Sequence, residues 1–130
     1  NKTINIEALT MIDMVYKYIM PSVLGYQEEL ANLLKKKKSL ELGLSTAMEE
    51  KTLQRLSQLG ECLTKRLAAL EEQTSAVKLI KDSLAAAKAY REKVFNAMCE
   101  LRLTIDELEL IVSKNHWQLP TYGEILYSVK

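Results

Sequence analysis

The sequence predicts an all-α fold: an elongated antiparallel three-helix bundle with long coiled-coil-like helices and a short aromatic C-terminal tail. Apolar residues recur at alternating steps of three and four over long stretches, which places them on one face of a helix. Glycine and proline number only 4 and 2 among 130 residues, so little interrupts those stretches. The composition, 48% hydrophobic and 27% charged, suits one helical domain that can bury a core.

The first helix is expected over residues 6–42, with Asn5 as its N-cap. Pro21 lies inside it and removes the amide donor to the carbonyl of Lys17, so the helix should bend there without ending. The apolar seam continues in register through this point, which indicates one bent helix rather than two. That seam comprises Leu9, Ile12, Tyr16, Ile19, Val23, Tyr26, Leu30 and Leu33.

Four lysines, residues 35–38, precede Gly43, a residue suited to a left-handed helix stop. Cations are favoured at a helix C-terminus, so we expect a solvated helix end. A change at Lys37 should then alter stability by no more than about 0.5 kcal/mol. A nucleic-acid module built on these lysines is the alternative, but no stacking aromatic residues lie beside them.

The second helix is expected over residues 46–81, where Thr46 and Glu49 have the spacing of a capping box. Its seam comprises Leu53, Leu56, Gly60, Leu63, Leu67, Leu70, Thr74, Val77 and Leu84. Beyond Leu84 a new frame fits better, formed by Leu84, Ala87, Val94, Met98, Leu101, Ile105, Leu108 and Val112. This change of phase predicts a turn near residues 81–83, with Asp82 or Ser83 capping a third helix over residues 83–114. A turn at residues 73–75 is the alternative.

The residues that carry chemistry do not form a catalytic constellation, and we name no catalytic, cofactor-binding or metal-binding residue. His116 is the only histidine, so a two-histidine metal site cannot be built, and we expect it to be a surface or helix-end residue. The acidic pairs Glu49/Glu50 and Glu71/Glu72 are typical of solvated helix faces. The methionines are interpreted as core filler. The four scattered glycines cannot make a phosphate loop.

Charge and cysteine content favour a cytoplasmic protein. The net charge of +1 gives no overall attraction to nucleic acid or acidic membranes. Cys62 and Cys99 lie far apart and are expected to be reduced thiols. Charges interrupt each apolar run before membrane length, and no signal peptide is recognisable. Because the chain begins at Asn1 rather than Met, we expect a fragment of a longer protein.

The tail, residues 117–130, changes character after the bundle of residues 1–116. It is rich in aromatic and aliphatic side chains but follows no helical period, and Pro120 disfavours helix at Leu119. So much apolar area should fold back and dock on another surface. The candidate docking residues are Trp117, Pro120, Tyr122, Ile125 and Leu126.

Two parts of the chain have a recognisable sequence. Near the start these are residues 5–14 and 19–21; near the end they are residues 94–98, 101–102, 106–109 and 117–126. The most specific part is residues 120–126, Pro-Thr-Tyr-Gly-Glu-Ile-Leu. Together these stretches resemble the C-terminal helical region of type III glutamine synthetases. The chain differs from the family pattern at Gln118, where a proline is expected, and residues 44–86 match only as generic helix.

The resemblance implies a parent enzyme that joins ammonia to glutamate with ATP and a divalent metal, Mg, in large cytoplasmic homo-oligomers. The family's catalytic core precedes the segment seen here, so none of its site residues falls on these 130 positions. The implied partners are the catalytic core of the same chain and sister subunits, with no nucleic acid and no membrane. The tail would then dock on its own bundle, on that core or on a neighbouring subunit. A free-standing coiled-coil adaptor that binds partner helices is the alternative function.

Overall fold

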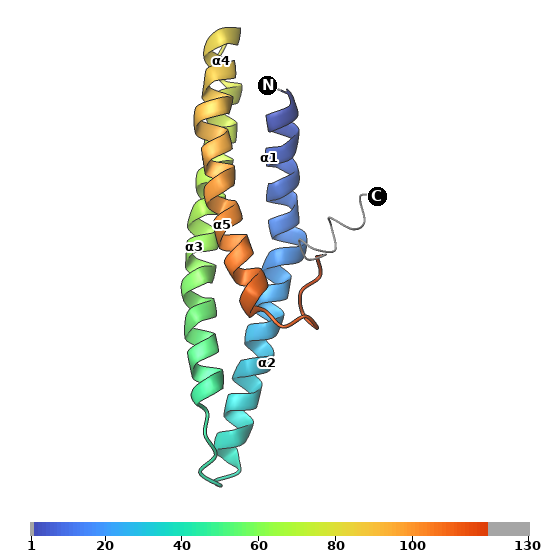
Figure 1. Cartoon of the computed structure of the whole chain (residues 1–130), viewed down its shortest axis with the longest axis vertical. Helices are drawn as coiled ribbons and strands as arrows, with labels where there is room; N and C mark the ends of the chain where they lie inside the picture. The colour runs from blue at the N-terminus through green and yellow to red at the C-terminus, as the bar shows by residue number, and fades with distance from the viewer. Residues whose placement is uncertain (1, 120–130) are drawn as a thin grey trace.

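Three helices account for most of the chain in the computed structural model, which describes residues 2–119 (Figure 1). The all-helical class predicted from the sequence is confirmed, because residues 2–119 contain no strand. The first helix consists of α1 (Lys2–Met14), the π-helical turn η1 (Val15–Ile19) and α2 (Met20–Ser39). The second is α3 (Ala47–Lys78), and the third consists of α4 (Ser83–Ala89), the π-helical turn η2 (Tyr90–Val94) and α5 (Phe95–Ile111).

Two short turns join the helices, and the chain reverses direction at each (Figure 1). At the first turn, Glu41 and Gly43 adopt left-handed backbone angles, with φ of 54° and 65°. At the second, the Asp82 carboxylate accepts a hydrogen bond of 3.0 Å from the amide of Ala85 and caps α4. Helix α3 runs unbroken through residues 73–75, so the earlier turn position is wrong.

The start of each long helix differs from the expected capping. The first helix already includes Lys2, so Asn5 lies within it and does not cap it. Thr46 precedes α3 but makes no side-chain cap, because its hydroxyl donates to Glu50 at 2.7 Å instead. The predicted capping box with Glu49 is therefore wrong.

The first π-helical turn explains an error in the predicted seam of the first helix. Here the amide of Met20 donates to the carbonyl of Val15, five residues back, so the turn holds one extra residue. The wider turn also lies where the Pro21 ring would crowd the carbonyl of an α-helix. The extra residue rotates the preceding helix by one position, so the core takes Ala8 and Val15 instead of Leu9 and Tyr16. Leu9 is 44% exposed and Tyr16 is 49% exposed.

Beyond that turn the predicted seam returns to register. Ile19, Val23 and Leu30 are buried. Leu33 is exposed, contrary to expectation (Figure 1). The reason is that α5 ends well above the turn between α2 and α3, here called the lower turn, so that only α3 lies beside this end of α2.

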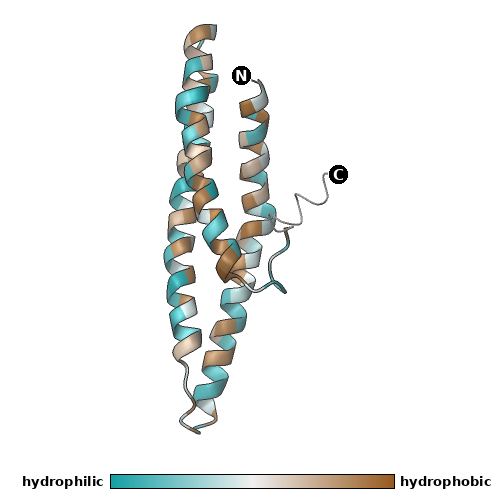
Figure 2. Ribbon diagram, in the orientation of Figure 1, coloured by the Kyte–Doolittle hydropathy of each residue, from teal (hydrophilic) through white to brown (hydrophobic). Residues whose placement is uncertain are grey.

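The second and third helices bury most of their predicted seams against each other and against the first helix. Hydrophobic and hydrophilic residues alternate along each helix, as an amphipathic surface requires (Figure 2). Leu84, shared by both predicted frames, is 77% exposed, because α4 extends past the N-terminal end of α1 (Figure 1). The buried seam residues are Leu56, Leu63, Leu67, Leu70, Thr74, Val77, Val94, Met98, Leu101, Ile105, Leu108 and Val112.

An ion pair ties the first helix to the second across the lower turn. The Lys37 ammonium pairs with Glu49 and also donates to the carbonyl of Ser45 at 3.2 Å. Glu49 is only 3% exposed, and the hydrogen bond from Lys37 lowers the pKa of its carboxyl group below the ordinary value. The predictions that Lys37 and Glu49 are solvated are therefore wrong.

Candidate docking site

The chain leaves the third helix through a compact turn that redirects it toward the first helix. Val112 adopts an extended conformation, with φ of −68° and ψ of 133°, so α5 cannot continue. The carbonyl of Ser113 then accepts hydrogen bonds from the amides of His116, at 2.9 Å, and Trp117, at 3.0 Å. The following residues, up to Leu119, are thereby directed to the surface of α1 and α2.

His116 and its neighbours attach this segment to α2. The His116 ring lies 5.4 Å from the Tyr26 ring, and its Nε2 atom is 3.0 Å from a Glu29 carboxylate oxygen. A Cβ atom at Gly25 would lie 3.2 Å from His116 Nδ1, so a glycine keeps this approach open. His116 is thus a tertiary contact residue, which sequence reasoning missed because Glu29 is 87 positions away.

A second attachment lies two residues further along. The amide of Gln118 donates to the hydroxyl of Ser22 at 3.2 Å, and that hydroxyl donates to the carbonyl of Tyr18 at 2.6 Å. Ser22 is 2% exposed, so its polar group is buried but satisfied. Both attachments hold residues 113–119, here called the return segment, against α2.

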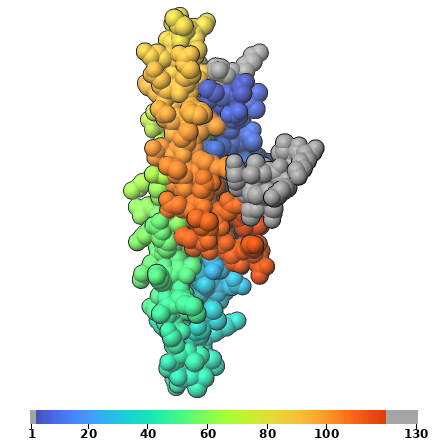
Figure 3. All heavy atoms as spheres, viewed as in Figure 1, coloured from blue at the N-terminus to red at the C-terminus, as the bar shows by residue number. Residues whose placement is uncertain are grey.

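The return segment forms one wall of an apolar groove of about 350 Å³, the docking groove. The other walls are α1 and α5, whose atoms lie side by side in the space-filling view (Figure 3). Three methionines give the groove a flexible apolar lining, which suits irregular partner surfaces. The residues lining the groove are Ile6, Glu7, Thr10, Met11, Met14, Met98, Arg102, Ile105, Asp106, Glu109, Trp117 and Leu119.

The interpretation of all methionines as core filler holds for only part of the set. Met98 is 7% exposed and belongs to the core, although one side of it reaches the groove. Met11 and Met14 are half-buried at the groove, and Met48 is 77% exposed at the lower turn. Because the first helix is rotated at η1, its sequence pattern alone does not place Met11 and Met14 at this surface.

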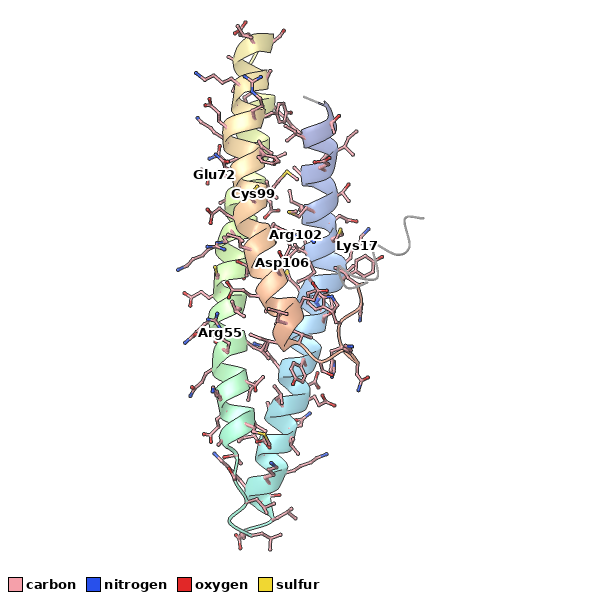
Figure 4. All side chains as sticks on the ribbon, in the orientation of Figure 1. Lys17, Arg55, Glu72, Cys99, Arg102 and Asp106 are labelled. Carbon is pink, nitrogen blue, oxygen red and sulfur yellow. The ribbon has the colours of Figure 1, made fainter. Side chains whose placement is uncertain are left out.

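Charged side chains line the groove on both long walls. On α5, the Arg102 guanidinium donates from Nε to Asp106 at 3.1 Å, so one acid and one base neutralise each other (Figure 4). Glu7 on α1 and Glu109 on α5 supply two more carboxylates. The groove therefore offers an apolar floor with polar, mainly acidic edges.

Trp117 carries a polar atom that remains unsatisfied within the described part of the chain. The side chain packs against the core, and its indole nitrogen Nε1 is buried without an acceptor among residues 2–119. A buried N–H without a partner is rare in proteins and calls for a physical explanation. Of the predicted docking residues, the structure thus places Trp117 in the groove, while Pro120, Tyr122, Ile125 and Leu126 lie outside the described residues.

Among residues 2–119, no three histidine, cysteine or acidic side chains are grouped as metal ligands. None of the helices described is long and apolar enough to traverse a bilayer. Both cysteines are free: Cys99 is exposed, and half-buried Cys62 lies 3.4 Å from the hydroxyl of Thr104.

Comparison with known proteins shows that the chain is similar to members of an enzyme family. The model of the glutamine synthetase C-terminal domain family matches residues 1–38. A glutamine synthetase of Butyrivibrio fibrisolvens is 33% identical over 130 residues, covering 100% of this chain and 19% of the relative. A type-3 glutamine synthetase of Dictyostelium discoideum is 27% identical over 131 positions, covering 98% of this chain and 18% of the relative. The chain thus spans about a fifth of the length of these curated relatives, and no solved structure matches it.

Proposed function

We propose that the chain is the non-catalytic helical C-terminal domain of a type III glutamine synthetase, because residues 1–38 match the C-terminal domain of this family and the whole chain is similar to two glutamine synthetases, one of them a type-3 enzyme. In this proposal it supports the assembly or packing of the catalytic core. The parent enzyme would ligate ammonia to glutamate in the cytoplasm, using ATP and Mg bound outside these residues. We also propose that the three long helices form an antiparallel bundle and pack against one another as in a coiled coil.

The observation that carries the proposal is an exposed apolar surface on the third helix. Phe95 is 47% exposed, Leu103 is 55% exposed and Leu110 is 86% exposed, all on α5. Exposed apolar side chains gathered on one element are typical of a surface that another protein part covers. In the proposal the catalytic core of the same chain, or a sister subunit, covers this surface.

The molecule is long and narrow, and the two ends of this rod support the same interpretation (Figure 1). Leu40 and Leu42 at the first turn are 59% and 69% exposed. At the opposite end, Leu79 and Leu84 are 82% and 77% exposed. A rod with apolar residues at both ends and along one side can contact several neighbours at once, as a domain that holds an assembly together must.

The catalytic part of the proposal is tested by assaying the 130-residue chain for glutamine formation. Purified chain, supplied with glutamate, ammonia, ATP and Mg, should form no glutamine above a protein-free control. The parent enzyme, assayed in parallel, shows that the conditions support turnover. Glutamine formation by the chain that rises in proportion to its concentration would overturn the non-catalytic assignment.

A further inference from the structure

We propose that the docking groove is the binding site for the chain's own last eleven residues, 120–130, which occupy it as an intramolecular apolar ligand. The groove is apolar and lined by three methionines, and Leu119, the last described residue, is part of its lining. Residues 120–130 are therefore joined to the rest of the chain at a residue that lines the groove.

The length of the segment suits the length of the site. The α1 wall runs from Ile6 to Met14, which is about 12 Å at the rise of an α-helix. Eleven residues can reach roughly 36 Å when extended, so the segment crosses the groove with residues to spare. Since it is tethered at Leu119, its local concentration at the groove is on the order of millimolar, which favours it over a free ligand of similar affinity.

The composition of the segment also matches the groove. Tyr122, Ile125 and Leu126 provide aromatic and aliphatic side chains for a methionine-lined surface. Its one acid and one base, Glu124 and Lys130, cancel, so binding brings no net charge to the site.

The buried indole nitrogen of Trp117 points to the same occupant. It lacks an acceptor among residues 2–119, and Trp117 lines the groove. Each residue of the segment brings a backbone carbonyl, and the first of them lies three positions after Trp117. A backbone carbonyl of the bound segment would satisfy this donor while its side chains cover the apolar lining.

The five methionines make the proposal measurable by nuclear magnetic resonance of ¹³C-methyl-labelled methionine. Met11, Met14 and Met98 line the groove, whereas Met20 and Met48 do not and serve as internal controls. Removal of residues 120–130 should shift the three groove signals and leave the Met48 signal in place. A peptide with the sequence of residues 120–130, added to the shortened chain, should return the groove signals toward their original positions.

A full-length variant keeps the test valid if the shortened chain fails to fold. Ile125→Asp combined with Leu126→Asp should shift the same three signals, with Trp117 emission moving to longer wavelength. The matched control, Leu79→Asp combined with Leu84→Asp, places the same charges on exposed positions far from the groove and should change neither readout. The proposal is overturned if the groove signals stay unchanged in the Ile125/Leu126 variant, or if they shift equally in the control.

Discussion

Leucine at position 101 should be among the most costly side chains to shorten in this chain. Its side chain is 0% exposed in the middle of α5, the element that packs most closely on α3. Leu101→Ala removes three carbon groups from the core, and at about 0.8 kcal/mol per buried group this costs about 2.4 kcal/mol. The cavity left behind adds to this loss, so we expect a total of about 3 kcal/mol, within the range of roughly 2–5 kcal/mol seen for such changes.

The matched control lies two residues away on the same helix. Leu103 is 55% exposed, so Leu103→Ala makes the same chemical change at a position that faces solvent. Helix propensity changes equally in both variants, which leaves burial as the difference between them. We expect the free energy of unfolding of Leu103→Ala to lie within about 0.5 kcal/mol of that of the unsubstituted chain.

Urea denaturation followed by far-ultraviolet circular dichroism measures both variants. With a slope of about 1–3 kcal/mol/M, a loss of about 3 kcal/mol moves the midpoint by roughly 1–3 M. In thermal unfolding, a chain of 130 residues should lose about 10 °C in midpoint temperature. Equal destabilisation by Leu101→Ala and Leu103→Ala would refute the assignment of the core face of α5.

Two further predictions concern the ion pair at the lower turn. Lys37→Met should destabilise the chain more than Lys38→Met in urea denaturation, because only Lys37 pairs with buried Glu49; equal effects would contradict this. The second prediction follows from the depressed pKa of Glu49, whose ordinary value is 4.5. The folded state then binds this proton more weakly than the unfolded state, so the pair stabilises the fold above pH 4.5 and that contribution is lost as the pH falls through the depressed pKa. The difference in unfolding free energy between the unsubstituted chain and Glu49→Gln should therefore shrink from pH 7 to pH 3. A difference that does not change with pH would argue against a stabilising role of the charged Glu49.

The spacing of apolar residues was enough to predict the helical class and most of the core of the second and third helices. The change of phase near Leu84 also indicated a turn that the structure places between Lys78 and Ser83. Both predictions need only the spacing of apolar residues within a single helix, and in a long amphipathic helix that spacing shows which residues face the core. The π-helical turns are different, because inserting one residue leaves the sequence pattern unmarked while rotating everything before it. Ala8 and Val15 therefore replaced Leu9 and Tyr16 in the core.

The contacts between distant segments could not be predicted from the sequence. Lys37 and Glu49 each appeared as one charge among many, and only the lower turn brings them together. His116 likewise meets Glu29 and Tyr26 across 87 and 90 positions, with no local pattern that marks the contact. The groove was missed for the same reason, since its walls come from both ends of the chain. The apolar content of the tail predicts that it docks on another surface, and this stays a prediction; the groove that we propose as its binding site could not be derived from the sequence.

The most direct test of the proposed assembly role measures the mass of the parent enzyme with and without this domain. The parent would be purified in full-length form and in a form that lacks the residues matching this chain, and both would be examined by mass photometry at equal concentration. Circular dichroism of the shortened enzyme shows whether its remaining part is folded. The proposal predicts that the shortened, folded enzyme loses the largest assemblies and shifts to smaller oligomers. An unchanged distribution of masses in the shortened enzyme would contradict it.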